Sequence, residues 1–203
     1  MKKMIGKSRR GQQMYEKLNK VILGVFPVIF MLAFLLSCQS DVKEGKKGKK
    51  SFFDIKAYFE SETQRLTNGN KVKKIVAVGD KKEERVLDSI NYRQELGIFS
   101  TSDINRPAWS DRYKTDSIFN DNKELIRLDY TANDEKLKTR KISIEFEKQT
   151  VVGVFIENNT TSTVASSRQV LTYRPTTGYI IESHQNAALA DDQDFLIEVQ
   201  FLK

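Results

Sequence analysis

A period-two alternation of apolar and polar residues runs from Lys123 to the C-terminus, and it constrains the fold more than any other feature. Ile126, Leu128 and Tyr130, for example, are separated by polar residues, and five later segments repeat the pattern. Such alternation is typical of β-strands with one covered and one solvated face. The short links between segments favour antiparallel neighbours. The sequence therefore predicts six strands, near residues 126–130, 142–146, 152–156, 168–174, 179–183 and 195–201.

Two helices and a hairpin are predicted ahead of these strands. Four apolar residues between Phe52 and Leu66 share one helical stripe, and Asn68-Gly69-Asn70 ends it. Alternation in residues 71–78 and a turn at 79–82 predict a hairpin with residues 83–87. A second helix is predicted from the i, i+4, i+7 spacing of its apolar residues, which are Tyr92, Leu96 and Phe99.

The fold class that these elements predict is α+β. Two or three N-terminal helices would pack on one face of a mainly antiparallel meander sheet of about six to eight strands. Residues 51–203 suffice for a single core. The chain has one cysteine, Cys38, so this domain would contain no internal disulfide. We expect a single globular α+β domain over 51–203.

The formal net charge of +7 belongs mainly to the N-terminal part of the chain. Residues 1–37 hold seven Lys or Arg and one acidic residue, and residues 38–50 carry a net charge of +3. Residues 51–203 have a net charge of −2. A domain without a basic excess has little with which to neutralise phosphates, so no nucleic-acid partner is expected.

An apolar run at residues 21–37 follows the basic N-terminus. Its seventeen residues lie between the lengths typical of a secretory signal and of a membrane-spanning helix. The run leads into Leu35-Leu36-Ser37-Cys38, which closely resembles the lipobox of bacterial lipoproteins. The alternatives are an uncleaved signal anchor and a buried thiol. The start codon is open among Met1, Met4 and Met14.

The resemblance implies cleavage between Ser37 and Cys38 and acylation of the Cys38 thiol, with palmitate among the chains. Acyl chains on Cys38 would then attach the protein to a membrane. Residues 1–37 are a lipoprotein signal peptide in this interpretation, and 38–50 are the lipidated cysteine and a disordered Lys/Gly tether. Gln39 is not the aspartate that retains proteobacterial lipoproteins in the inner membrane, which favours the outer membrane of the cell envelope.

The whole chain resembles uncharacterised lipoproteins of Bacteroidota, a likeness that implies no activity. Within it, Asp88-Ser89-Ile90 and Asp116-Ser117-Ile118 resemble the O-glycosylation sequence of exported Bacteroidota proteins. Ser89 and Ser117 are therefore weak candidate glycosylation sites, because about one such match arises by chance in a chain of this composition.

No catalytic, metal-binding or cofactor-binding residue is predicted. His184 is the only histidine, and Ser183 beside it would point to the opposite face of a strand. The acidic residues Asp191, Asp192 and Asp194 favour a solvated turn over a calcium site. Zincin, EF-hand, P-loop and dinucleotide motifs are absent from the sequence. Enzyme activity is uncertain and not favoured.

Three functions remain in view. The first is a lipid-anchored envelope protein that acts as a binding or structural module for an envelope protein or glycan. The second is a carrier or receptor of apolar ligands or lipids, in a pocket between a curved sheet and helices. The third is an envelope hydrolase that uses His184 or a pair of carboxylates.

Overall fold

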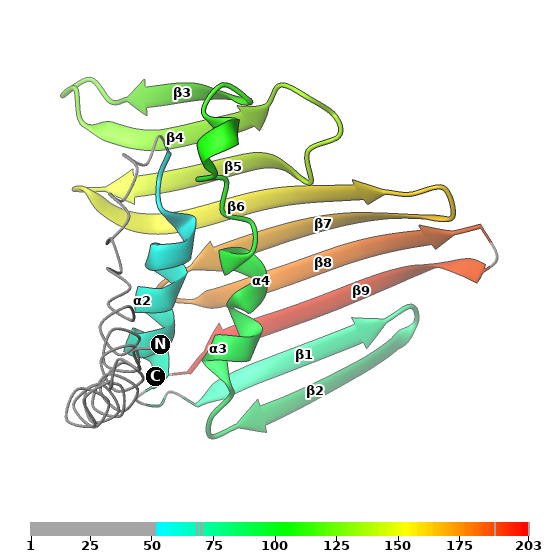
Figure 1. Cartoon of the computed structure of the whole chain (residues 1–203). Helices are drawn as coiled ribbons and strands as arrows, with labels where there is room; N and C mark the ends of the chain where they lie inside the picture. The colour runs from blue at the N-terminus through cyan, green and yellow to red at the C-terminus, as the bar shows by residue number, and fades with distance from the viewer. Residues whose placement is uncertain (1–51, 68, 70, 189, 203) are drawn as a thin grey trace, which may run out of the picture. The chain divides into compact units, whose positions relative to one another are not determined.

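The computed structural model describes residues 52–67, 69, 71–188 and 190–202 (Figure 1). The signal, Cys38 and tether predictions lie outside these residues. The described helices are α2 Ile55–Thr67, α3 Tyr92–Glu95, α4 Gly97–Ser100 and the 3-10 turn η1 Pro107–Trp109. The strands are β1 Val72–Val78, β2 Lys81–Leu87, β3 Tyr113–Phe119, β4 Leu125–Ala132, β5 Thr139–Glu147, β6 Thr150–Thr161, β7 Ala165–Arg174, β8 Gly178–Ala187 and β9 Ala190–Phe201.

All nine described strands form one antiparallel sheet, in the order β2-β1-β9-β8-β7-β6-β5-β4-β3. Strands β3 to β9 follow one another as a meander. The N-terminal hairpin β1–β2 joins the far side of this meander, because β1 pairs with β9 from Val72↔Phe201 to Val78↔Phe195. Figure 1 accordingly shows β2 at one edge of the sheet and β3 at the other.

The three α-helices lie on the same side of the sheet (Figure 1). We call this side the helical face, and Ile144, Val154 and Tyr173 point into it. The opposite side, to which alternate residues such as Glu145 and Thr172 point, is the open face. Ile144 is fully buried and Val154 is 2 % exposed, so the predicted inward positions of these two residues are confirmed. In β6 a register shift places Val151, and not the predicted Val152, against the core.

Aromatic side chains attach the helices to the sheet. The rings of Phe59 in α2 and Phe99 in α4 stack at 4.7 Å, and Phe59 meets Tyr173 of β7 edge-on at 5.1 Å. All three side chains are fully buried. The predicted apolar stripe of the first helix is confirmed, and Asp54 caps it by accepting a hydrogen bond from Ala57 N at 3.0 Å. Packing therefore fills the space between helices and sheet.

Two acidic side chains on the helical face have partners there. Glu62 of α2 accepts two hydrogen bonds from Arg65, at 2.7 and 2.9 Å, and one from the Tyr173 hydroxyl. Glu95 of α3 binds Lys74 and accepts a 2.8 Å hydrogen bond from Tyr179. Burial raises the pKa of both phenols above the ordinary value, and the adjacent carboxylates add to the effect. These pairs link α2 and α3 to the sheet.

The prediction of an α+β fold was wrong. The described chain is β-rich, with nine strands, and α2 is its one helix of more than a single turn. The apolar residues of the predicted second helix are buried as expected, but the chain ends one turn at Leu96 and begins another at Gly97. Glycine is a poor helix former, so a continuous helix through Gly97 is disfavoured. The two separate turns still allow Leu96 and Phe99 to pack on the core.

Candidate binding surface on the open face

The open face carries charged side chains that pair between strands, either adjacent strands or strands separated by one other. Arg174 of β7 lies 3.2 Å from Glu145, and Arg168 of β7 lies 3.0 Å from Glu157 of β6. These pairs are partly exposed and contribute little to stability. Their effect is to give this face a defined arrangement of charge, which can discriminate between binding partners.

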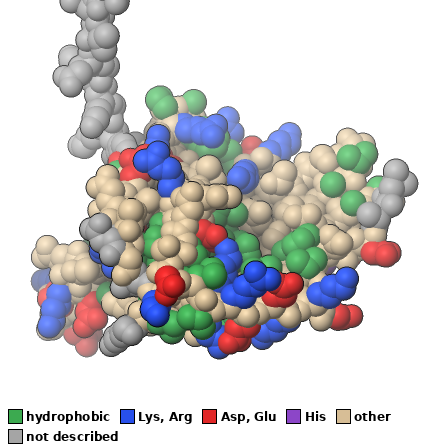
Figure 2. Space-filling model, turned by 90° about the horizontal axis from the view of Figure 1, so that it is seen from below, with side chains coloured by type: hydrophobic (Ala, Val, Ile, Leu, Met, Phe, Trp, Pro, Cys, Tyr) green, Lys and Arg blue, Asp and Glu red, His purple; other side chains and the backbone are tan. Residues whose placement is uncertain are grey.

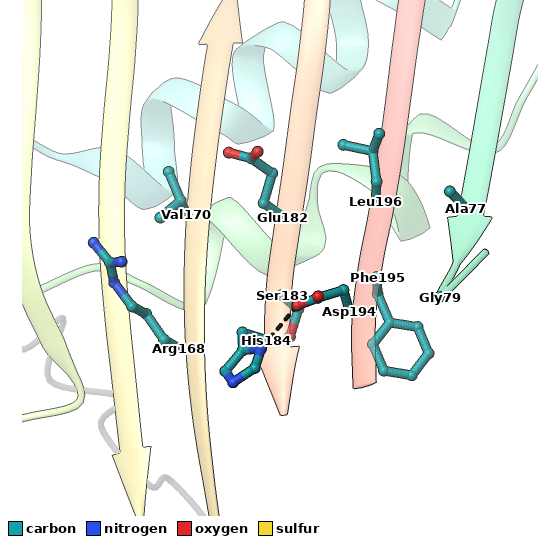
Figure 3. Close-up of a pocket in the computed structure, with 10 residues that line it drawn as sticks. All are labelled: Ala77, Gly79, Arg168, Val170, Glu182, Ser183, His184, Asp194, Phe195 and Leu196. Carbon is teal, nitrogen blue, oxygen red and sulfur yellow. Dashed lines mark hydrogen bonds and ion pairs between the residues drawn. The ribbon is translucent and has the colours of Figure 1, made fainter. Parts of the chain in front are cut away.

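A cavity of about 360 Å³ opens on this face across β7, β8, β9 and β1 (Figure 3). Its charged lining consists of Arg168, Glu182, His184 and Asp194. Between these groups lie apolar side chains on the same face, which are Ala77, Val170 and Leu196.

The strand register explains why these residues meet. Arg168 pairs with His184, which pairs with Asp194 on the next strand. One step along the strands, Val170 pairs with Glu182, which pairs with Leu196. Directly paired residues of antiparallel strands point to the same face, so the two rows form one continuous patch.

His184 is held by carboxylates of the facing strand. Its Nδ1 lies 2.8 Å from Asp194 Oδ1, and its Nε2 lies 3.8 Å from Asp192 Oδ2. Asp192 also accepts a hydrogen bond from Asn186 at 2.6 Å. The imidazole is 53 % exposed, so it can contact a partner while Asp194 fixes its orientation.

Glu182 is the charged group of the cavity that has no partner among the described residues. Its exposed side chain makes no hydrogen bond or ion pair with another described residue. The nearby Arg168 cannot readily compensate, because its Nε donates to Glu157 Oε1 at 3.0 Å. The cavity therefore has more carboxylates than unpaired basic side chains, which favours a positively charged group on the ligand.

Ser183 and His184 point to opposite faces, as the sequence predicted for neighbouring strand residues. Ser183 pairs with Phe195 and Gln169 on the helical face, and its buried hydroxyl has no hydrogen-bond partner in the described part of the chain. Ser183 is therefore not placed to act as a nucleophile for the His184–Asp194 pair. Among the described residues, no group of three or more His, Cys, Asp or Glu side chains could hold a metal ion.

Three acidic residues that were predicted to form a solvated turn instead lie at the start of β9. Asp191, Asp192 and Asp194 lie within β9 and not in a turn, so that interpretation was wrong. Arg168 and Glu182 were not singled out at all. A predicted β8–β9 hairpin with His184 opposite Asp194 could have brought these two residues together. Placing Arg168 beside them also requires the pairing of β7 with β8.

The remaining predicted sites are not brought together by the structure. Ser89 and Ser117 are both exposed, with Ser117 on the edge strand β3, and their glycosylation stays a prediction. Ser37 and Cys38 lie outside the described residues. Within those that are described, no helix is long and apolar enough to cross a bilayer.

Comparison with known proteins gives no match. No protein-family model fits the chain, and no curated protein or solved structure is significantly similar to it.

Proposed function

We propose that this protein is a lipid-anchored envelope protein whose domain binds a partner protein through the open face of its sheet. Acyl chains on Cys38 would hold it at the outer membrane, as the lipobox resemblance implies. The cavity around Glu182 would receive a Lys or Arg side chain of the partner. An envelope glycan is the alternative ligand for the same surface.

The observation that carries this proposal is the unpartnered carboxylate of Glu182 above an apolar patch. A basic side chain has a charged end and an aliphatic stem. Its charge would pair with Glu182, and its stem would contact Val170 and Leu196, which flank Glu182 in the register. The site is open and shallow, as expected for a contact with a protein surface rather than for an enclosed small molecule.

The two rival functions find less support. A carrier of apolar ligands needs space between sheet and helices, and there Phe59, Phe99 and Tyr173 are fully buried and in mutual contact. A hydrolase based on His184 needs a nucleophile near the imidazole, and the adjacent Ser183 lies on the other face. Recognition by a binding module requires neither feature.

Photo-crosslinking in cells tests the binding surface. A diazirine amino acid at Val170 should crosslink the domain to one defined envelope protein. Glu182→Lys should abolish this product, because it replaces attraction by repulsion. Glu147→Lys is the matched control, since Glu147 is an exposed acidic residue of β5 outside the cavity. Equal crosslinking in all three backgrounds would contradict the assigned surface.

Metabolic labelling tests the anchor separately. The wild type should incorporate a palmitate analogue, because the lipobox resemblance implies acylation of Cys38. Two or more acyl chains would then attach the protein stably to the membrane. Cys38→Ala should incorporate none and should accumulate as an uncleaved precursor. A wild type without label that migrates and fractionates like Cys38→Ala would show that residues 21–37 act as a plain signal anchor.

A further inference from the structure

The sheet has two free edges, β2 and β3, and they differ in side-chain composition. A free edge presents unpaired backbone groups to which another strand can add. In β3 the five residues from Lys114 to Ile118 are exposed or half-exposed, and Phe119 is 57 % exposed. Strand β3 therefore offers both backbone and side chains to a partner strand.

The hydrogen-bond phase of β3 identifies the residues whose backbone points outward. Asn133 N donates to Arg112 O at 2.9 Å, at the position that continues the pair Tyr113↔Ala132. Antiparallel pairs alternate between hydrogen-bonded and non-hydrogen-bonded. Lys114 and Asp116 consequently bond to β4, whereas Tyr113, Thr115 and Ser117 direct their N–H and C=O groups to the free edge.

The charges of β3 favour a two-fold register centred on Thr115. In a two-fold antiparallel pair, the central residue faces its own copy. A centre at Lys114 or Asp116 would oppose like charges, which is unfavourable. A centre at Thr115 instead places Lys114 opposite Asp116 of the second copy, twice over. It also makes the three outward residues the hydrogen-bonded ones and leaves the charged pairs at the closer, non-hydrogen-bonded positions.

We propose that two copies of this chain associate through β3, antiparallel and centred on Thr115, to form one continuous sheet. Asp116 supplies a further reason. Asp116 lies directly opposite Asp129 of β4, so two carboxylates are neighbours. Within one copy, Asp116 forms an ion pair with the exposed Lys114, at 3.0 Å. Lys114 of the second copy adds positive charge at this pair of carboxylates.

The opposite edge excludes the same arrangement. Residues 81–85 of β2 are Lys81, Lys82, Glu83, Glu84 and Arg85. Every two-fold centre among them opposes two identical charges. Figure 2, viewed from the β2 side, shows Lys, Arg, Asp and Glu side chains close together along this edge. Charged edge strands of this kind resist pairing. Association through β3 alone closes at two copies, because a two-fold interface uses the same surface on both.

A disulfide tests the register directly. Thr115→Cys in the full-length protein should form a covalent dimer under mild oxidation, and peptide mass spectrometry should find position 115 of one copy linked to position 115 of the other. Paired residues lie about 5.5 Å apart between Cα atoms, which suits a disulfide. Ser117→Cys is the matched control, because this exposed residue faces Tyr113 of the second copy and not itself. Equal crosslinking at positions 115 and 117, or none at 115, would overturn the proposal.

Charge reversal tests the selection of register. Sedimentation of the unmodified full-length protein in detergent should show a monomer–dimer equilibrium. Lys114→Asp should weaken it by about tenfold or more, because two attractive pairs become repulsive. The double variant Lys114→Asp/Asp116→Lys restores both pairs and should recover the wild-type affinity. A monomeric wild type, larger open oligomers, or a double variant as weak as Lys114→Asp would each refute this interface.

Discussion

The two faces of the sheet differ in where their charges find partners. On the helical face, Glu62 and Glu95 are enclosed by Arg65, Lys74 and two tyrosines among closely packed aromatic rings. On the open face, the Arg174–Glu145 pair is half-exposed, and Glu182 makes no ion pair with a described residue. The helical face therefore accounts for stability, while the open face is available for recognition. Substitutions on the two faces should separate these properties.

The largest expected effect is on the helical face. Ile144→Asp and Val154→Asp should each unfold the domain, with a loss of at least about 4 kcal/mol, because a charge would be buried without a partner. Chemical denaturation followed by circular dichroism measures the loss. Glu147→Lys on the open face should change stability by about 0.5 kcal/mol or less. Glu145→Lys should also have a small effect, although it removes the exposed contact with Arg174. Equal damage from the apolar and acidic positions would contradict the assignment of faces.

Loss of the enclosed acidic group should have an intermediate effect. Glu62→Ala removes a buried carboxylate that accepts hydrogen bonds from Arg65 and Tyr173, so we expect about 2–3 kcal/mol of destabilisation. Thermal denaturation measures this loss, and the control variant is Glu60→Ala in the same helix. Glu60 is exposed and lies 3.9 Å from Lys56, so its removal should cost less than about 0.5 kcal/mol. Similar losses for the two variants would argue against a special role for the Glu62 cluster.

High pH should weaken the helical face selectively. Burial raises the pKa of Tyr113 from 10.0 to about 12, and its hydroxyl donates to Thr139 O at 2.9 Å. A phenol with a higher pKa in the folded chain binds its proton more tightly there. Stability is therefore fully present below about pH 10 and falls as pH rises towards 12. Urea denaturation across this range measures the fall, which should be smaller in Tyr113→Phe. Constant stability over the range would contradict the burial of the phenols.

The smallest expected effect is on the open face. Asp194→Asn and His184→Gln each disrupt the contact between His184 and Asp194, whose two side chains are 53 % and 79 % exposed. Such a pair contributes about 0.5 kcal/mol or less. Differential scanning calorimetry should show nearly unchanged melting, while the crosslink from Val170 should weaken. A large loss of stability would mean that this pair holds the β8–β9 hairpin together.

The sequence predicted the strands whose two faces differ strongly. Ile142, Ile144 and Phe146 alternate with polar residues because one side of β5 is buried. It missed β3, since Lys114, Thr115, Asp116 and Ser117 are polar on both sides and this edge strand buries little. The break between α3 and α4 was also missed, because Leu96 and Phe99 satisfy helical spacing without belonging to one helix.

The candidate site was less predictable than the strands. His184 and the acidic residues near Asp194 are visible in the sequence, but their meeting depends on the β8–β9 register. Arg168 reaches them through a second register, that of β7 and β8. Glu182 gains its meaning only from the lack of a partner among the described residues. Alternation specifies which face a residue occupies, whereas its neighbours across strands require the pairing itself.

The place of β9 between β8 and β1 bears on how the chain folds during synthesis. This strand is synthesised after the other eight described strands, yet it joins the N-terminal hairpin to the meander. Val72 pairs with Phe201, so the contact spans almost the whole described chain. Pairings of such high contact order form slowly. The β1–β2 hairpin therefore lacks its neighbour until β9 has been synthesised, and a nascent chain stalled before residue 195 would leave β1 and β8 as exposed edges.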